Sequence, residues 1–437
     1  MMGRLAVEKN SYRSASVVGK ILPSLLPEGR PTWNEETPTS ECAPRGGATD
    51  ADRRRERKGF LKLLGVLLIT AGGLSVADCV ADPAQEAACS MPRVPRNKAA
   101  RSQLEIGLRQ AAEREPTSFE ANYRLGEFYV QAGKLKAGIP YLEKAHQLNP
   151  AHYANGYDLA LAYFETGDLL KARRQIQGML GQRDNAELHN LLGEVEEKSA
   201  DPVRATQEYQ LASQLDPSEG NIFDWGNELL LHGAFEVAKE VFSGGLELHP
   251  NSARLHIGLG IALYSRGLYD DAAQALCRAA DLEPSDPRPY VFLGKMSEIS
   301  LRQAGEVKTR LRRFMQSHPR DAQAHYYYAM SVWKGERIPN GKGDAREVED
   351  HLKQAIALNP AIEEAHLQLG NFYANEQKFQ DAILEYLQAI RLKPDLASAH
   401  YRLAHAYMRS GDKLLAQQEL ELYQRIHARE TAGDAKK

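Results

Sequence analysis

The chain has 437 residues, of which 43% are hydrophobic and 26% charged, and its formal net charge at pH 7 is −3. This hydrophobic share can form a buried core, which excludes a wholly disordered chain, and a mean hydropathy of −0.50 excludes a protein with many membrane spans. The balanced charge does not indicate nucleic-acid binding, which usually requires a basic surplus, and four cysteines are too few for a fold held together by disulfides.

The first segment, residues 1–52, is rich in Pro, Gly, Ser, Thr and charged residues and shows no sustained periodicity. This composition predicts a disordered leader. Export signals normally stand at the very start of a chain, so one hypothesis is that the leader comes from a start site assigned too far upstream. No Met lies between Met2 and Met91, and this hypothesis therefore requires a start codon other than Met.

Residues 53–82 have the three parts of an export signal or membrane anchor. A basic run at 53–58 precedes an apolar stretch at 59–77 that ends in small residues. Such a basic run stays on the cytoplasmic side while the apolar part partitions into the membrane. Two outcomes remain open. Cleavage near Ala77 or Ala81 would give an exported protein, periplasmic or secreted, whereas an uncleaved stretch would anchor the chain by a single N-terminal span.

Two cysteines, Cys79 and Cys89, stand close together just after the apolar stretch. If this region is exported, the two thiols are near enough in sequence to form a small disulfide loop, and two unpaired thiols are the alternative. A lipid-attachment cysteine needs a small residue before it, and Asp78 argues against lipidation of Cys79. We interpret residues 83–100 as a linker.

From about residue 100 the chain repeats itself with a period near 34 residues. Leu followed by Gly or Ala, then an aromatic residue, a turn Gly and an Ala recur in phase within each period. Asp184 stands where one closing proline is missing. The prolines that close the other periods are Pro116, Pro150, Pro217, Pro250, Pro284, Pro319, Pro360 and Pro394. Self-similarity at this period indicates a solenoid of paired helices.

The recurring residues have mechanical reasons in a helix pair. The small residue lets two helices approach closely, and proline stops the second helix and begins the next pair. Glycine ends the first helix in the left-handed conformation. The glycines that we expect in this turn are Gly133, Gly167, Gly233, Gly267 and Gly411.

These in-phase positions resemble the tetratricopeptide repeat family over residues 117–428. The resemblance implies an all-α fold, a right-handed superhelical solenoid of about nine helix-turn-helix repeats. We expect a capping helix at 101–116, an inserted loop at 334–343 and a polar tail at 429–437. The expected repeats are 117–150, 151–184, 185–217, 218–250, 251–284, 285–319, 320–360, 361–394 and 395–428.

We find no catalytic constellation, because the metalloprotease, P-loop, Cys-x-x-Cys and nucleophile-elbow motifs are all missing from the sequence. We interpret the histidines of the first helices as partly buried, hydrogen-bonded residues: His256, His366, His400 and His405. We interpret a basic cluster on one second helix as a solvated face: Lys308, Arg310, Arg312 and Arg313. We therefore expect no enzyme activity, no metal and no cofactor.

The resemblance implies that the first helices line a concave groove that binds extended peptides or a partner's helix. Aromatic and Arg side chains are common at protein-binding hot spots. We expect these residues in the groove: Tyr123, Arg124, Tyr157, Phe164, Phe223, Arg254, Tyr264, Phe292, Tyr326, Tyr327, Trp333, Tyr401 and Arg402. The strongest candidates are Tyr326, Tyr327 and Trp333, beside the inserted loop. The alternative for each aromatic residue is simple packing between helices.

The family's clamp for a partner's terminal carboxylate is matched only in part. Asn371 and Arg402 fit it, whereas Leu367 stands where a Lys would be needed. We predict an exported or membrane-tethered scaffold that binds a protein or peptide and no nucleic acid. The alternative is an accessory or assembly subunit of an envelope enzyme or transferase complex, which would copurify with that enzyme in a fixed ratio.

Overall fold

The computed structural model describes residues 95, 97–296, 302–335 and 342–434. Helices account for 81% of these residues, and no strand occurs among them, which confirms the predicted all-α fold. The leader, the signal or anchor, and the Cys79–Cys89 pair lie outside the described residues. The described chain divides into two units, which we call unit 1, up to residue 250, and unit 2, from residue 251.

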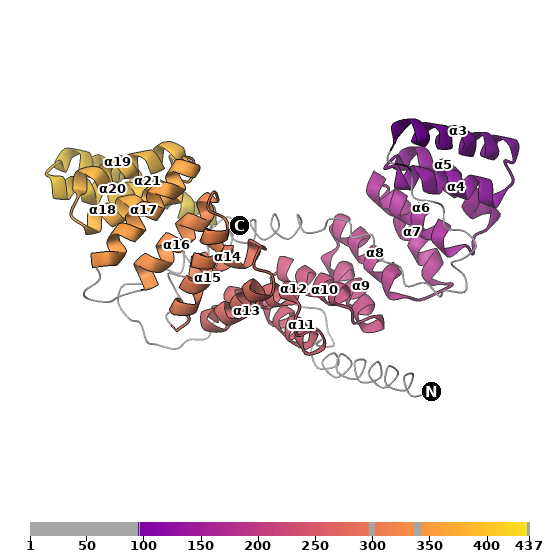
Figure 1. Ribbon diagram of the computed structural model, residues 1–437, viewed down its shortest axis with the longest axis horizontal. Coiled ribbons are helices and arrows are strands. Elements are labelled where there is room, and N and C mark those ends of the chain that lie inside the picture. The colour runs from indigo at the N-terminus through magenta and orange to yellow at the C-terminus, as the bar shows by residue number, and fades with distance from the viewer. Residues whose placement is uncertain (1–94, 96, 297–301, 336–341, 435–437) are drawn as a thin grey trace. The chain divides into compact units, whose positions relative to one another are not determined.

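Unit 1 begins with one single helix, α3, and continues as pairs of helices (Figure 1). We call the even-numbered helix of each pair a first helix and the odd-numbered one a second helix. Leu104 and Leu108 of α3 pack against Leu125 and Phe128 of the next helix, in the place expected for a cap. The helices are α3 (Lys98–Arg114), α4 (Phe119–Gln131), α5 (Leu135–Leu148), α6 (Tyr153–Thr166), α7 (Leu169–Leu180), α8 (Ala186–Lys198), α9 (Pro202–Leu215), α10 (Glu219–Leu231) and α11 (Phe235–Leu248).

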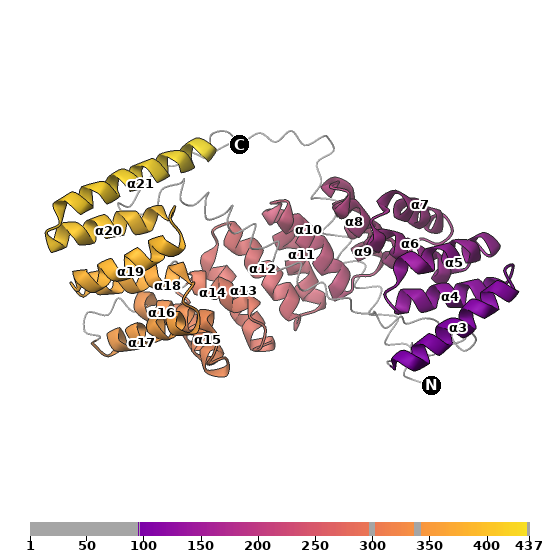
Figure 2. The same cartoon turned by 90° about the horizontal axis from the view of Figure 1, so that it is seen from above.

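Unit 2 consists of five further pairs among its described residues. Figure 2 shows the long last helix, α21, lying alongside α20. It reaches Asp434 and so includes most of the segment that we interpreted as a polar tail. The helices are α12 (Ala253–Ser265), α13 (Tyr269–Leu282), α14 (Arg288–Met296), α15 (Ala304–Ser317), α16 (Ala322–Gly335), α17 (Lys342–Leu358), α18 (Glu363–Asn375), α19 (Phe379–Leu392), α20 (Ala397–Ser410) and α21 (Lys413–Asp434).

In several pairs, among them α10/α11 and α12/α13, a glycine of the first helix packs against a bulky residue of the second. A Cβ atom added to Gly226 would lie 2.5 Å from Cζ of Phe242. A Cβ atom on Gly260 would likewise lie 2.5 Å from Cγ of Leu276. Since no real side chain tolerates such a distance, these glycines permit the close packing of the two helices.

The turn inside each pair needs a left-handed residue. All five expected turn glycines have positive φ angles, between 69° and 101°, which confirms the prediction. In two of the pairs whose turn the structure describes, this glycine is missing, and there Ala200 and Gln377 adopt the same conformation, with φ of 58° and 61°. For residues with a Cβ atom this conformation costs about 1–2 kcal/mol, so the turn geometry is maintained even where the sequence does not favour it.

A buried histidine connects the turn between two pairs with the second helix of its own pair. In His400, Nε2 lies 3.0 Å from the carbonyl oxygen of Pro394, and Nδ1 lies 2.6 Å from Oε2 of Glu419. His366 makes the corresponding contacts one pair earlier, at 3.3 and 2.7 Å. Both side chains are buried, so our interpretation of these two histidines is confirmed. His405, in contrast, is exposed.

We expect the last helix pair to lose stability as the pH rises through the pKa of His400. Both ring nitrogens face acceptors, and the hydrogen bond to Glu419 raises the pKa of His400 above its usual 6.5. A raised pKa in the folded state contributes stability that is fully present below the unfolded pKa and lost above the folded one. Urea unfolding of the wild type and of His400→Gln should therefore differ most at about pH 5.5–6.5 and less at higher pH. A difference that does not change with pH would contradict this.

Candidate functional site

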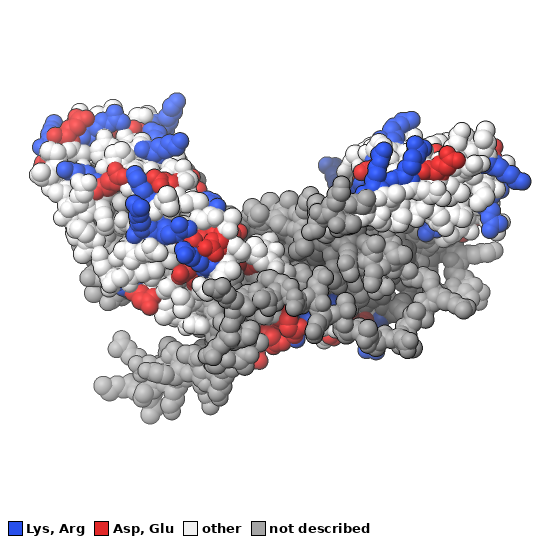
Figure 3. Space-filling view, turned by 180° about the vertical axis from the view of Figure 1, so that it is seen from behind, with Lys and Arg blue, Asp and Glu red and all other residues white. Residues whose placement is uncertain are grey.

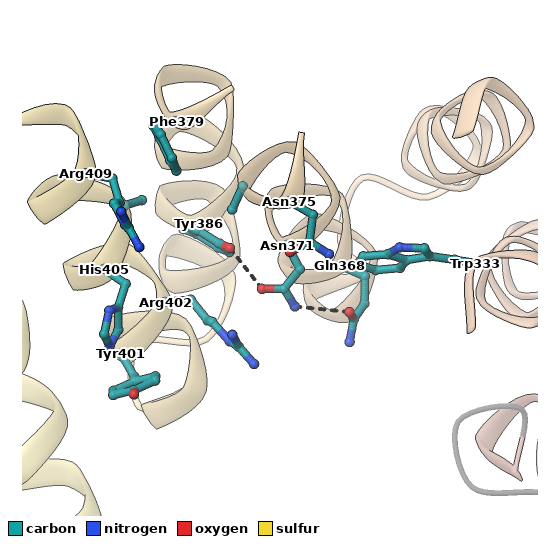
Figure 4. A pocket seen from close by; sticks show the side chains of 12 residues that line it. Trp333, Gln368, Asn371, Asn375, Phe379, Tyr386, Tyr401, Arg402, His405 and Arg409 are labelled. Carbon is teal, nitrogen blue, oxygen red and sulfur yellow. Dashed lines mark hydrogen bonds between the residues drawn. The ribbon is translucent and has the colours of Figure 1, made fainter. Parts of the chain in front are cut away.

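A pocket of about 500 Å³ lies in the C-terminal part of unit 2 (Figure 4). Helices α16, α18, α19 and α20 contribute its walls, so three first helices and one second helix meet here. The side chains that line it are Trp333, Gln368, Asn371, Ala374, Asn375, Phe379, Tyr386, Tyr401, Arg402, His405, Ala406 and Arg409.

One wall of the pocket contains two consecutive hydrogen bonds that start at the buried Tyr386. Tyr386 is buried and its hydroxyl donates to Oδ1 of Asn371 at 2.9 Å, and Nδ2 of Asn371 donates to Oε1 of Gln368 at 3.1 Å (Figure 4). Burial raises the pKa of Tyr386 to about 12, so its hydroxyl remains a donor at neutral pH. The amide of Asn371 is therefore held in one orientation toward the pocket.

The opposite wall is basic. Arg402, His405 and Arg409 follow one another at spacings of three and four residues on α20 and face the pocket together. Neither guanidinium forms an ion pair with a carboxylate of the described residues. Planar guanidinium groups bind carboxylates through two parallel hydrogen bonds, so this wall is suited to an anionic group.

Aromatic rings complete the pocket. The Trp333 ring meets Phe372 edge to face, with 5.9 Å between the centroids. Tyr401 is 39% exposed and lies 4.5 Å from the His405 ring and 5.3 Å from the Tyr423 ring. Such surfaces bind apolar side chains while the polar groups beside them determine orientation. The pocket can therefore accept a ligand that combines an apolar group with a carboxylate.

Three of the residues that we expected in a groove line this pocket: Trp333, Tyr401 and Arg402. Five others are buried among the helices: Tyr123, Phe164, Phe223, Phe292 and Tyr327. The remaining five are half-buried or exposed and lie outside the pocket: Arg124, Tyr157, Arg254, Tyr264 and Tyr326.

The three strongest candidates are not brought together. Tyr327 fills the space beside Gly294, where a Cβ atom would collide with its ring. Tyr326 packs against a buried cluster that includes Ile362. Of the three, only Trp333 reaches the pocket. Packing between helices, the alternative that we kept open, is what the structure shows for Tyr327.

Sequence reasoning did not select Arg409, Phe379 and Tyr386 as site residues. Arg409 follows Arg402 by seven residues, and this spacing alone places both on one face of a helix. Tyr386 has no such signal in its own helix, because its role depends on the contact between its hydroxyl and the Asn371 amide of the preceding helix. Leu367, which stands where the family's clamp has a Lys, is buried and does not line the pocket.

The basic cluster of α15 is half-buried at Lys308 and Arg310 and exposed at Arg312 and Arg313, and three of its residues also bind neighbouring helices. Arg310 and Arg313 donate to the two carboxylate oxygens of Asp281 on α13, at 2.6 and 3.0 Å. Arg312 donates to the hydroxyl of Tyr328 at 2.9 Å. These residues therefore hold α15 against its neighbours. On the face drawn in Figure 3, the described Lys and Arg side chains lie beside Asp and Glu side chains rather than in one large basic field.

Two absences concern only the part of the chain that the structure describes. There, no three His, Cys, Asp or Glu side chains are grouped so that they could hold a metal ion. In the same part, no helix combines the length and the apolar character that crossing a membrane requires.

Family models match four stretches of the chain. Models described as tetratricopeptide repeat match residues 96–152 and 223–287, and residues 129–195. A model described as TPR repeat matches residues 370–411. The matches lie in both units and include α20 and the C-terminal part of α18, which line the pocket.

Similar proteins share the repeats over part of their length. A peroxisomal targeting signal receptor of Candida albicans is 26% identical over 208 residues, which are 45% of this chain and 35% of the receptor. Cellulose synthase operon protein C of Pseudomonas fluorescens is 28% identical over 269 residues, 55% of this chain and 20% of that protein. The chain thus spans about a third or less of these curated relatives.

Among solved structures, the C-terminal part of a TPR repeat-containing protein from Cytophaga hutchinsonii aligns with a TM-score of 0.46 at 15% identity. The alignment covers 64% of this chain and 99% of that one.

Proposed function

Because this chain is a tetratricopeptide repeat protein, we propose that it is a non-enzymatic scaffold that binds a peptide or helical segment of a partner protein. Repeat geometry provides a surface, and the side chains on it determine the ligand. The observation that supports the proposal is the pocket of unit 2. There, Trp333, Asn371 and Arg402 come together from three successive first helices.

The chemistry of the pocket specifies the kind of segment. The guanidinium groups of Arg402 and Arg409 favour a carboxylate, and the rings of Trp333 and Tyr401 favour an apolar side chain beside it. Asn371 offers an amide whose orientation is already established by Tyr386. A short segment with an acidic residue next to an apolar one fits this arrangement.

A peptide selection tests this proposal. A phage-displayed library of random peptides is panned against the full chain, and the binding of a selected, fluorescein-labelled peptide is measured by fluorescence anisotropy. We expect selected peptides to contain Asp or Glu beside an apolar residue. Arg402→Ala and Trp333→Ala should each weaken binding by about tenfold or more, the effect of losing roughly 1.4 kcal/mol.

Arg391→Ala is the matched control, because Arg391 is exposed on the second helix α19 and does not line the pocket. It should leave binding unchanged. Selected peptides that bind Arg402→Ala as tightly as the wild type would show that the pocket is not the binding site.

The location of the scaffold is a separate proposal. We propose that the chain is exported, or anchored by a single span at residues 59–77, because a basic run precedes this apolar stretch. Mass spectrometry of the mature N-terminus from fractionated cells tests it. A start just after Ala77 or Ala81 supports export, and an intact stretch in the membrane fraction supports an anchor. An intact stretch in the cytosolic fraction would contradict both.

An accessory or assembly subunit of an envelope enzyme or transferase complex is the second candidate. The similarity to a cellulose synthase operon protein favours it over other specialised roles. Affinity purification from membranes distinguishes the two. Copurification of a glycosyl- or peptidyl-transferring enzyme in a fixed ratio supports the accessory role, and varied partners support a general scaffold.

A further inference from the structure

A histidine recurs at one position of several first helices, and in three helix pairs a glutamate of the second helix faces it. Nδ1 of each histidine lies 2.6–2.7 Å from a carboxylate oxygen, and the two residues are 19 positions apart. The three contacts are His189 with Glu208, His366 with Glu385 and His400 with Glu419. A carboxylate stabilises the charged imidazole, so these contacts persist when the ring takes up a proton.

The pair of α16 and α17 has a second imidazole in the place of the glutamate. Nδ1 of His325 on α16 lies 2.9 Å from Nδ1 of His351 on α17. The two residues are 26 positions apart, because this pair contains the inserted segment 334–343. The register is nevertheless the same, since a buried alanine follows four residues after His351, as it does after Glu385.

The geometry limits how many protons the two rings can hold. Nε2 of His325 lies 3.1 Å from the carbonyl oxygen of Pro319, which only accepts, so this nitrogen carries a proton. In the neutral pair, Nδ1 of His325 is therefore the acceptor and Nδ1 of His351 the donor. One further proton is tolerated, because a charged imidazole still donates to a neutral one. After a second, both Nδ1 atoms would carry a hydrogen and face each other at 2.9 Å.

Burial makes two charges at this contact still less favourable. His325 is only 6% exposed, and His351 is half-buried. Burial, and then the charge of His325, lowers the pKa of His351 from its usual 6.5. In contrast, the hydrogen bond to Glu419 raises the pKa of His400 in the last pair. The same position of the repeat thus responds to acid in opposite directions in the two pairs.

Neighbouring charges on α17 and α15 do not take the place of the missing glutamate. Glu347 and Asp350 favour the charged form of His351, but less than burial and the facing ring disfavour it. Glu347 accepts a hydrogen bond at 2.5 Å from the hydroxyl of Tyr328, whose ring meets the His351 ring edge to face. The same hydroxyl accepts from Arg312 of α15 at 2.9 Å.

The charged groups of the other adjoining segments have contacts of their own. The carboxylate of Asp321, just before α16, accepts from backbone N–H groups at the start of that helix. On the side of α18, the carboxylate of Glu349 accepts from Lys353 and from the hydroxyl of Tyr373. On α14, Arg288 is paired with an aspartate of the preceding turn. None of these printed contacts brings a carboxylate to either Nδ1 atom.

We propose that the contact between His325 and His351 makes this helix pair acid-sensitive: α16 and α17 stay together at neutral pH and separate when both imidazoles are protonated. Below about pH 6.5, the opened pair binds two protons on these rings and the closed pair binds one. Stability rises with pH wherever the open state binds more protons. The closed pair therefore loses stability as the pH falls below about 6.5.

This opening would act on the pocket of unit 2. Trp333 lines the pocket and follows His325 on α16 by about two helical turns. Its ring also meets Phe372 of α18 edge to face. Separation of α16 from α17 would displace one wall of the pocket, so acid should release a bound peptide. This consequence rests on the proposed peptide binding, whereas the acid-sensitive contact itself does not.

Hydrogen exchange of the full chain, followed by mass spectrometry between pH 5 and 7.5, tests the proposal. After correction for the intrinsic exchange rate, opening of α16 and α17 should become about tenfold more frequent for each pH unit below about pH 6, the factor for uptake of one proton. Helices α20 and α21, joined by His400 and Glu419, should not show this increase. An equal response of the two pairs would overturn the proposal.

Exchanging the two kinds of contact sharpens the test. His351→Glu restores the recurring glutamate and should abolish the acid-induced opening, and His351→Gln, which cannot be charged, should abolish it as well. Glu385→His creates facing imidazoles in the pair of α18 and α19 and should make that pair acid-sensitive. His318→Gln is the matched control, because this ring bonds within the end of α15, and it should behave like the wild type. Acid-induced opening that persists in both His351 variants would overturn the proposal.

A binding measurement separates this proposal from the proposed function. The fluorescein-labelled peptide selected against the full chain should bind the wild type at least about tenfold more weakly at pH 5.5 than at pH 7.5, and His351→Glu should reduce this difference. Acid-dependent exchange with no peptide bound at either pH would support the acid-sensitive contact and count against peptide binding in the pocket. Acid release of the peptide without any change in exchange of α16 and α17 would overturn the proposal.

Discussion

Replacing Arg173 with Met should destabilise unit 1 by about 3–5 kcal/mol at neutral pH. Nε and Nη2 of Arg173 on α7 donate to the two carboxylate oxygens of Glu196 on α8, at 2.6 and 2.5 Å. The side chain of Glu196 is only 3% exposed. Without the guanidinium of Arg173, the carboxylate of Glu196 stays buried and has lost its cationic partner. Since α7 and α8 belong to different pairs, the contact between two neighbouring repeats is weakened.

Urea unfolding followed by circular dichroism measures this loss. Arg174→Met is the matched control, since Arg174 is the exposed neighbour on the same helix, and it should change stability little. The double variant Arg173→Met, Glu196→Met should recover much of the loss. Equal losses in the single and double variants would show that the buried charge is not the cause.

Gly370→Val should destabilise the pocket region by about 1–3 kcal/mol and abolish peptide binding there. A Cβ atom on Gly370 would lie 2.6 Å from Cε1 of Tyr386. The Tyr386 ring must then move, and its hydroxyl can no longer hold Asn371 at 2.9 Å. Solenoid repeats contact mainly their neighbours, so hydrogen exchange should increase in α18 to α20 more than elsewhere.

Two further variants separate packing from hydrogen bonding in this region. Gly305→Val introduces the same side chain into α15, where a Cβ atom meets no other atom within 4 Å, and should not reduce stability. Tyr386→Phe keeps the ring and removes only the hydroxyl, so peptide binding should fall more than stability does. An unchanged melting temperature in Gly370→Val would contradict the packing argument.

Local rules explain why the repeats could be predicted from the sequence. The turn glycines end first helices in a conformation that other residues avoid, and the recurring small residues mark where two helices touch. Both signals depend on neighbours a few residues away in the chain. The helix ends were less accurate: α21 continues to Asp434, and α16 and α17 both extend into the segment 334–343 that was interpreted as a loop, because helix formation tolerates polar residues at exposed ends.

The candidate site could be predicted only in part. Trp333, Tyr401 and Arg402 were expected from residue type and line the pocket, but Tyr327 was expected for the same reason and is buried beside Gly294. Aromatic residues on first helices serve packing and binding alike. Which of the two applies depends on whether the neighbouring pair covers the ring, and one helix's own sequence does not contain that information.

The sequence by itself determined the period, the all-α pairing of helices and the left-handed turns, because these follow from backbone preferences and from contacts within one pair. Only the tertiary structure decided which charges are compensated. Arg173 meets Glu196 across two pairs, whereas Asp158 and Glu194 meet other carboxylates. Electrostatic free energy depends on the distance between charges and on their burial. For residues about 20–30 positions apart, the stacking of the pairs determines both quantities.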